Sequence, residues 1–170
     1  MTNIRKFYKP LAEGAPKPEI NQSNELERVI HFFPPHLKKV TNKLDEIVKK
    51  TDVILGNLED GIAPKDKIKA RVEFAKKSKK LNLKNTSLWT RVNSISSEWF
   101  LDDISFLIKE LGNTLDVIML PMINTSEEIL FADRIIALNE AKNRLKKQIK
   151  IHIILETAEG VMNVESLAAC

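Results

Sequence analysis

The chain contains a single cysteine, Cys170, at the end of its 170 residues. One cysteine excludes a disulfide within the chain and a metal site built from cysteines, and it fits a reducing cytoplasm. No neighbouring residue is a recognisable base for Cys170, so a nucleophilic thiol is not expected. The chemistry of this chain must therefore come from other side chains.

Other familiar signatures are missing as well. Residues 1–22 contain three prolines and no apolar run, which excludes a signal peptide and a membrane span in this segment. No Arg-rich stripe with interleaved aromatic residues occurs, so nucleic acid is not an expected partner. The histidines have no zinc spacing, and no Gly-x-Ser-x-Gly elbow is present.

The composition is that of a globular protein, with 43% hydrophobic and 29% charged residues. The formal net charge of +4 comes from scattered lysines, and runs such as Lys76–Lys80 are typical of a solvated helix face. This charge is compatible with an anionic ligand such as a phosphorylated cofactor. We expect residues 1–27 to form an irregular arm and residues 28–170 to form one folded domain.

Five short apolar runs rich in β-branched residues recur along the chain. Most of them are nearly continuous, which is the pattern of strands buried on both faces of a parallel sheet. They span Val29–Phe33, Val53–Leu58, Leu88–Val92, Val117–Leu120 and Ile151–Leu155.

Amphipathic helical patterns occupy the spaces between these runs. Thr125 and Glu128 have the spacing of a capping box, and Asn163 stands where it could cap a last helix from Val164. The expected helices cover Pro35–Lys50, Pro64 to about Lys80, Trp99–Leu111, and a long segment from Thr125 to about Arg144.

The alternation of strands and helices predicts an α/β fold with right-handed crossovers. Two architectures fit, an open doubly wound sheet and a TIM (β/α)8 barrel. The segment Phe33–His36 follows the first strand without a Gly-rich phosphate loop, which disfavours the dinucleotide-binding form of the open sheet. A complete barrel needs about 250 residues. We therefore expect a barrel truncated to about its first five β/α units, with the C-terminal part missing.

Charged residues follow the expected strands at their carboxyl ends. Glu59 and Asp60 come after the second run, Arg91 ends the third, and Glu156 follows the fifth. In a barrel these ends converge on the face where active sites are built, and such side chains could hold a hard cation and stabilise an oxyanion. Simpler roles stay open: helix N-terminal charges for Glu59 and Asp60, a structural ion pair for Arg91, and an exposed loop acid for Glu156.

Five segments carry a family resemblance. They are Arg28–Pro34, Val53–Pro64 with Lys67 and Arg71, Thr90–Asn93 followed by Trp99–Phe100 and Asp102–Asp103, Asp116–Pro121, and Ile154–Glu165. In this order they resemble the HpcH/HpaI aldolase/citrate lyase β-subunit family, and the match covers residues 28–170. The spacing from Leu111 to Glu156 looks most like the malyl-CoA lyase branch of the family.

The resemblance implies a cytoplasmic lyase that uses Mg²⁺, with Mn²⁺ as a substitute, and forms a homo-oligomer when full length. Such enzymes cleave a 3-hydroxyacyl-CoA thioester such as malyl-CoA into acetyl-CoA and glyoxylate, a 2-oxo acid, or run the reverse condensation. By position, Glu156 matches a metal carboxylate, Arg91 matches the arginine that binds the substrate and stabilises the oxyanion, and Phe32 and Lys43 match residues lining the CoA pocket.

In the family, the second metal carboxylate and the acid/base aspartate lie beyond the position of Cys170, so we expect this chain to be inactive alone. The chain also departs from the family pattern: Asn57 replaces an Asp, Pro35 a Gly and Met122 a Lys. The alternatives are a malyl-CoA thioesterase, a citramalyl-CoA or citryl-CoA lyase, and a degenerate, non-catalytic paralogue that binds CoA or a partner.

Overall fold

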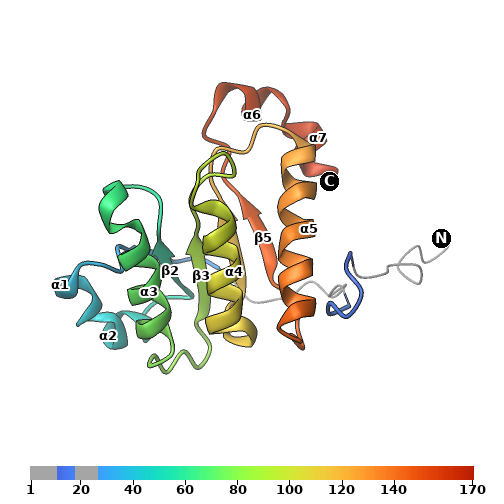
Figure 1. Ribbon diagram of the computed structural model, residues 1–170. Helices are drawn as coiled ribbons and strands as arrows, with labels where there is room; N and C mark the ends of the chain where they lie inside the picture. The colour runs from blue at the N-terminus through green and yellow to red at the C-terminus, as the bar shows by residue number, and fades with distance from the viewer. Residues whose placement is uncertain (1–10, 18–26) are drawn as a thin grey trace.

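A computed structural model describes residues 11–17 and 27–170. Five parallel strands form one sheet whose spatial order, β1-β2-β3-β4-β5, is also their order along the chain (Figure 1). The strands are β1 (Ile30–Phe33), β2 (Val53–Asn57), β3 (Ser87–Arg91), β4 (Val117–Leu120) and β5 (Lys150–Ile153).

Each crossover between neighbouring strands carries helix. The sequential strand order is that of a barrel wound in one direction, because a doubly wound sheet reverses its order at a switch point. The helices are α1 (Lys38–Thr41), α2 (Leu44–Val48), α3 (Lys67–Ser78), α4 (Phe100–Leu111), α5 (Ser126–Lys142), α6 (Ala158–Met162) and α7 (Val164–Ala168), with 3-10 turns at Pro64–Asp66 and Gly112–Thr114.

The sheet separates two groups of buried residues. Alternate strand residues such as Ile54, Leu88 and Ile118 belong to a large core that also contains buried side chains of α2 to α5. The residues between them point to the other face, because successive side chains of a strand alternate. There Val53, Leu55, Trp89, Val117 and Met119 form a second, smaller cluster.

Gly56 of β2 allows α3 to pack closely on the sheet. A Cβ atom at this position would lie 2.2 Å from Cδ2 of Phe74, far inside van der Waals contact. The Phe74 ring is fully buried and lies 5.9 Å from the Phe33 ring. The absence of a side chain at Gly56 thus allows α3 to approach the carboxyl end of β2 this closely.

Three local expectations can be compared with the structure. The capping box of Thr125 and Glu128 is confirmed at the start of α5. The helix expected over Pro35–Lys50 is wrong as a single helix, because it breaks into α1 and α2 at Lys43, whose ψ is 0°. Asn163 does not cap α7 with its side chain, since its amide donates to the Asn124 carbonyl at 2.9 Å instead.

The described part of the N-terminal arm, residues 11–17, contains no helix or strand and lies beside α5 (Figure 1). Arg134 of α5 donates a hydrogen bond to the Leu11 carbonyl, and Ala12 is buried. Residues 1–10 and 18–26 lie outside the described residues. Among those described, no helix has the length and apolar character needed to cross a lipid bilayer.

Candidate active site at the carboxyl edge of the sheet

Parallel pairing places the residues that end β2, β3 and β4 side by side at one edge of the sheet. Asn57 is in register with Arg91, and Arg91 is in register with Met119. Arg91 alternates with Thr90, so its side chain lies on the same face as Trp89 and the smaller buried cluster. This is the inner face of a barrel, and the carboxyl edge is where a barrel builds its active site.

The Arg91 guanidinium is buried among three carboxylates from two loops. Its Nη2 lies 2.6 Å from Oε2 of Glu59 and 3.1 Å from Oε1 of Glu156, and its Nη1 lies 2.9 Å from Oδ2 of Asp60. The expectation that Arg91 and Glu156 meet at one edge is therefore confirmed. Glu59 and Asp60 are also partners of Arg91, rather than only charges near the start of a helix.

Glu156 is oriented from two sides. Both of its carboxylate oxygens accept from Nη2 of Arg91, at 3.1 and 3.3 Å, and Oε1 also accepts from the backbone N–H of Met122 at 2.9 Å. Met122 has a φ of 55°, a left-handed conformation that is uncommon for a residue with a Cβ atom. This backbone, just after β4, directs an N–H group to the carboxylate that follows β5.

The loop after β2 is held by the side chain of Asn57. Its Oδ1 accepts from the Glu59 N–H at 3.0 Å, and its Nδ2 donates to the Asp60 carbonyl at 3.2 Å. An aspartate could make the first hydrogen bond but not the second, because an ionised carboxylate has no donor. The amide at this position thus closes the turn that presents Glu59 and Asp60.

Burial and the neighbouring carboxylates change the pKa of Glu59. Burial raises the pKa of Glu59 above its ordinary value of 4.5; the Arg91 guanidinium opposes this shift, whereas Asp60 and Glu156 add to it. The pKa of Glu59 is raised even beside a guanidinium because burial is the largest influence and two further carboxylates share the same cation.

The two other predicted site residues lie apart from this cluster. Phe32 of β1 is in register with Leu55, and its side chain is 46% exposed. Lys43 is exposed just before α2. Among the described residues, neither makes a hydrogen bond or ion pair with the side chain of Arg91 or Glu156.

The structure places a layer of buried polar residues behind the site, formed by Lys67, Arg71, Asn93 and Asp103. These residues were identified from the sequence only as parts of the family-like segments, and no role was predicted for them. One signal was available: Lys67 and Arg71 are four residues apart on a helix and therefore share a face. Asp103, between the apolar Phe100 and Ile104, was a second. The contact of the Met122 N–H with Glu156 could not be predicted, because the residue type methionine does not indicate a left-handed backbone conformation.

The described residues meet the needs of a metal only in part. The Glu156 carboxylate is a hard oxygen ligand of the kind Mg²⁺ prefers, and its side chain is 30% exposed. Within residues 11–17 and 27–170, however, no group of three or more His, Cys, Asp or Glu side chains is placed to hold a metal ion. Glu156 can therefore serve as one ligand but not as a complete site.

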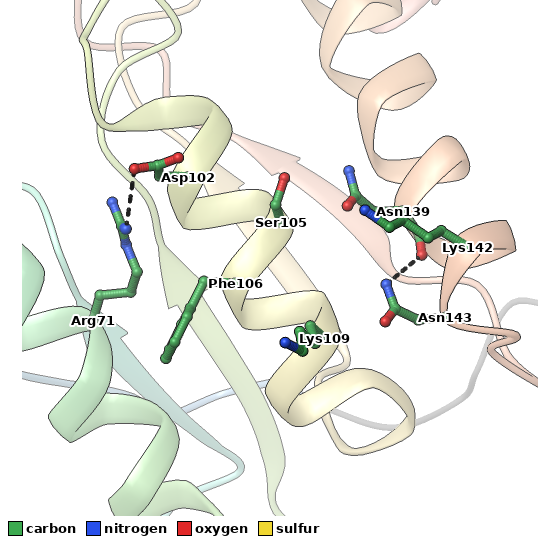
Figure 2. A pocket seen from close by; sticks show the side chains of 8 residues that line it. All are labelled: Arg71, Asp102, Ser105, Phe106, Lys109, Asn139, Lys142 and Asn143. Carbon is green, nitrogen blue, oxygen red and sulfur yellow. Dashed lines mark hydrogen bonds and ion pairs between the residues drawn. The ribbon is translucent and has the colours of Figure 1, made fainter.

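A groove of about 360 Å³ lies elsewhere, on the helix side of the sheet between α4 and α5 (Figure 2). Asp102 and Lys109 line it from α4, and Asn139 and Lys142 from α5. Neither Arg91 nor its three carboxylate partners line this groove, so we take the carboxyl edge of the sheet as the candidate active site.

A family model described as HpcH/HpaI aldolase/citrate lyase matches residues 28–170. The chain belongs to this family. A malyl-CoA/beta-methylmalyl-CoA/citramalyl-CoA lyase of Chloroflexus aurantiacus is 46% identical over 162 residues, which are 95% of this chain and 47% of that protein. An L-malyl-CoA/beta-methylmalyl-CoA lyase of Rhodobacter capsulatus is 31% identical over 144 residues, 85% of this chain and 45% of the relative.

The fold is likewise shared with solved structures. CitE from Mycobacterium tuberculosis, in complex with magnesium, acetoacetate and coenzyme A, superposes with a TM-score of 0.62 at 19% identity, covering 85% of this chain and 46% of CitE. These matches confirm the barrel-type α/β fold expected from the sequence. The chain spans about half the length of the curated relatives it matches.

Proposed function

We propose that residues 28–170 form the first half of the catalytic barrel of a carbon–carbon lyase acting on a 3-hydroxyacyl-CoA such as malyl-CoA. The contact between Arg91 and Glu156 at the carboxyl edge carries the proposal. The 46% identity to a malyl-CoA/beta-methylmalyl-CoA/citramalyl-CoA lyase supports it. Citramalyl-CoA is a further candidate substrate for the same reason.

The proposed reaction breaks the bond between C2 and C3 of the acyl chain. A base takes the proton of the 3-hydroxyl group, the hydroxyl carbon becomes the aldehyde of glyoxylate, and the bonding electrons move onto the thioester as an enolate. Protonation of the enolate carbon gives acetyl-CoA. We assign Arg91 to the enolate oxygen, because a fixed guanidinium in a buried site stabilises developing negative charge. The base belongs to the part of the lyase outside this chain.

Glu156 is proposed as one carboxylate ligand of Mg²⁺, with Mn²⁺ as a substitute. The magnesium in the CitE complex supports this choice of ion. A bound divalent ion would polarise the oxygens of the hydroxy-acid part of the substrate. The further ligands would come from the second half of the barrel, so we propose that residues 1–170 are inactive alone.

Phe32 and Lys43 are proposed to contact CoA. Phe32 offers an exposed aromatic surface on the inner face of β1, and the exposed Lys43 suits a phosphate as a point charge. The coenzyme A in the CitE complex supports a CoA thioester as the substrate. We also propose that the full-length protein is a homo-oligomer. A cytoplasmic location is proposed as well, and the single cysteine in residues 1–170 supports it.

Activity with malyl-CoA tests the proposal. The full-length protein with Mg²⁺ should release glyoxylate and acetyl-CoA, and Arg91→Gln should lower kcat by about 10²- to 10³-fold, the usual effect of removing an oxyanion donor. Arg28→Gln is the matched control, since Arg28 is an exposed arginine paired with Asp52 at the opposite edge of the sheet. Its kcat should stay within about twofold of wild type.

The products separate the alternatives. Free malate without glyoxylate would identify a thioesterase, in which water attacks the thioester. Turnover of none of the malyl-, citramalyl- and citryl-CoA thioesters, despite CoA binding, would identify a non-catalytic paralogue. Either result would overturn the lyase proposal.

A further inference from the structure

Helix α3 directs two cations into the interior instead of into solvent. Lys67 and Arg71, one turn apart on the same face, are 7% and 6% exposed. Burying a cation costs free energy unless every donor is well placed, and an apolar side chain of similar volume is often equally stable. Stability alone therefore does not explain why both positions carry a charge.

Lys67 binds the loop that carries the acids of the site. Its Nζ donates to the Leu58 carbonyl at 3.1 Å and to the Glu59 carbonyl at 2.5 Å, and it lies 5.6 Å from the centre of the Trp99 ring. Burial lowers the pKa of Lys67, while nearby acids, Glu59 first among them, oppose this shift.

Arg71 binds the loop after β3 through Asp103. Its Nε donates to Oδ1 of Asp103 at 2.7 Å, while Oδ2 of Asp103 accepts from the backbone N–H and the side-chain amide of Asn93 at 3.0 and 2.7 Å. Arg71 also pairs with Asp102, the ion pair drawn in Figure 2, and donates to the Trp99 carbonyl at 3.4 Å. Asp103 itself is 1% exposed.

Both links end next to Arg91. Asn93 is two residues beyond it, and the Leu58 N–H donates to the Arg91 carbonyl at 2.8 Å. We infer that Lys67 and Asp103 are positioning residues: they hold the loops after β2 and β3 in register, so that Glu59 and Asp60 keep the Arg91 guanidinium aimed at the reacting thioester. The inference rests on the proposed lyase function, and it assigns a role to the motif residues Lys67, Arg71 and Asp103.

The kinetic test uses Lys67→Met, which keeps an unbranched side chain one atom shorter and removes the donors. In the full-length protein we expect kcat for malyl-CoA to fall about 10- to 100-fold with KM changed less than about threefold, because a misplacement near 1 Å affects the transition state more than binding. Lys69→Met is the matched control, since Lys69 is an exposed lysine of the same helix. Its kcat should not change, and a Lys67→Met enzyme as fast as this control would overturn the inference.

A double-mutant cycle separates positioning from a general loss of stability. If Lys67 acts through the loop of Glu59, Lys67→Met should cost much less in a Glu59→Gln background than in wild type, whereas independent effects would multiply. Multiplicative losses of kcat would show that Lys67 serves the fold only, and would also overturn the inference.

Amide hydrogen exchange gives a measurement that does not depend on activity. Lys67→Met should speed exchange of the Leu58 amide, and Asp103→Asn that of the Asn93 amide, each by about tenfold or more, with the amides of α5 unchanged. Unchanged exchange at both amides would overturn the inference even in an active enzyme. A wild-type protein that cleaves no CoA thioester would instead overturn the proposed function, and the exchange rates would still decide the positioning role.

Discussion

The cluster at the carboxyl edge contains one positive side chain and three acidic ones. Among the described residues, Arg91 is the one cation that forms ion pairs with the side-chain carboxylates of Glu59, Asp60 and Glu156. A guanidinium has five donors and can serve several carboxylates, but it neutralises only one of them. The remaining negative charge agrees with the proposal that Glu156 serves as one ligand of a divalent cation.

The pKa of Glu59 makes stability depend on pH in a defined direction. Because burial raises the pKa of Glu59 in the folded protein, the folded state holds more protons than the unfolded state from pH 4.5 up to the raised value. Its contribution to the free energy of unfolding is therefore lost as pH rises through this window. Urea unfolding from about pH 4 to about pH 7 should show wild type losing stability relative to Glu59→Gln.

Glu110 provides a control of opposite sign. A hydrogen bond from Lys79 lowers the pKa of Glu110 below its ordinary 4.5, so its contribution is present above that value and is lost as pH falls through the lowered pKa. Wild type should therefore lose stability relative to Glu110→Gln on acidification. A stability difference between wild type and Glu59→Gln that is flat with pH, or that changes in the same direction as for Glu110→Gln, would contradict the account of the site.

The sequence predicted the site only where a residue type and its place on a strand agreed. Arg91 and Glu156 stood out because polar residues at the ends of apolar runs are expected at the carboxyl edge. Asp103 was named only as part of a family-like segment, and its role could not be predicted, since its partners Arg71 and Asn93 are brought to it by tertiary packing. Contacts of this kind depend on tertiary distances that spacing along the chain does not contain.

Among the helices and strands, the cap of α5 could be predicted from the sequence, whereas the break between α1 and α2 and the packing of α3 on the sheet could not. The capping box of α5 was visible as Thr125 and Glu128, because its hydrogen bonds join residues three apart. The break between α1 and α2 was hidden, because the apolar spacing of Pro35–Lys50 continues through it. The approach of α3 to β2 depends on Gly56 and Phe74, which are distant in sequence.

Substitution of Gly56 tests this packing. Gly56→Ala should lower the free energy of unfolding by about 1–3 kcal/mol, because the new methyl group overlaps the Phe74 ring. Phe74→Leu removes the ring and leaves a cavity that the methyl group can partly fill. The double variant Gly56→Ala/Phe74→Leu should therefore cost clearly less than the two single losses added together, as measured by denaturant unfolding.

Gly61 provides the control position for the double-mutant cycle of Gly56 and Phe74. Its φ of +71° makes an alanine strained, but no atom lies within 4 Å of the added Cβ. Gly61→Ala and Phe74→Leu should thus add to within about 0.5 kcal/mol. Additive losses for Gly56 as well would show that Phe74 does not limit the approach of α3.

The five-stranded sheet has an edge strand at each end, β1 and β5. Within the described residues, β1 pairs only with β2 and β5 only with β4. The order of the five strands could be predicted from the alternating pattern and the preference for right-handed crossovers. The elements that would pair with the outer edges of β1 and β5 could not be predicted, because this chain matches only 47% of the length of the Chloroflexus aurantiacus relative.

An unpaired strand presents a row of backbone donors and acceptors that can pair with another chain. We therefore expect residues 1–170, expressed alone, to self-associate, with a mass by light scattering that rises with protein concentration. His152 is an exposed residue of β5 on the face that carries Trp89, and the two ring centres lie 5.2 Å apart. His152→Lys adds an inward-pointing charge to this edge strand and should lower the degree of association. Ser105→Lys, which adds the same charge at an exposed position of α4, should leave it unchanged. A concentration-independent monomer would show that the edges of β1 and β5 are already protected, and that the second half of the barrel is not needed to cover them.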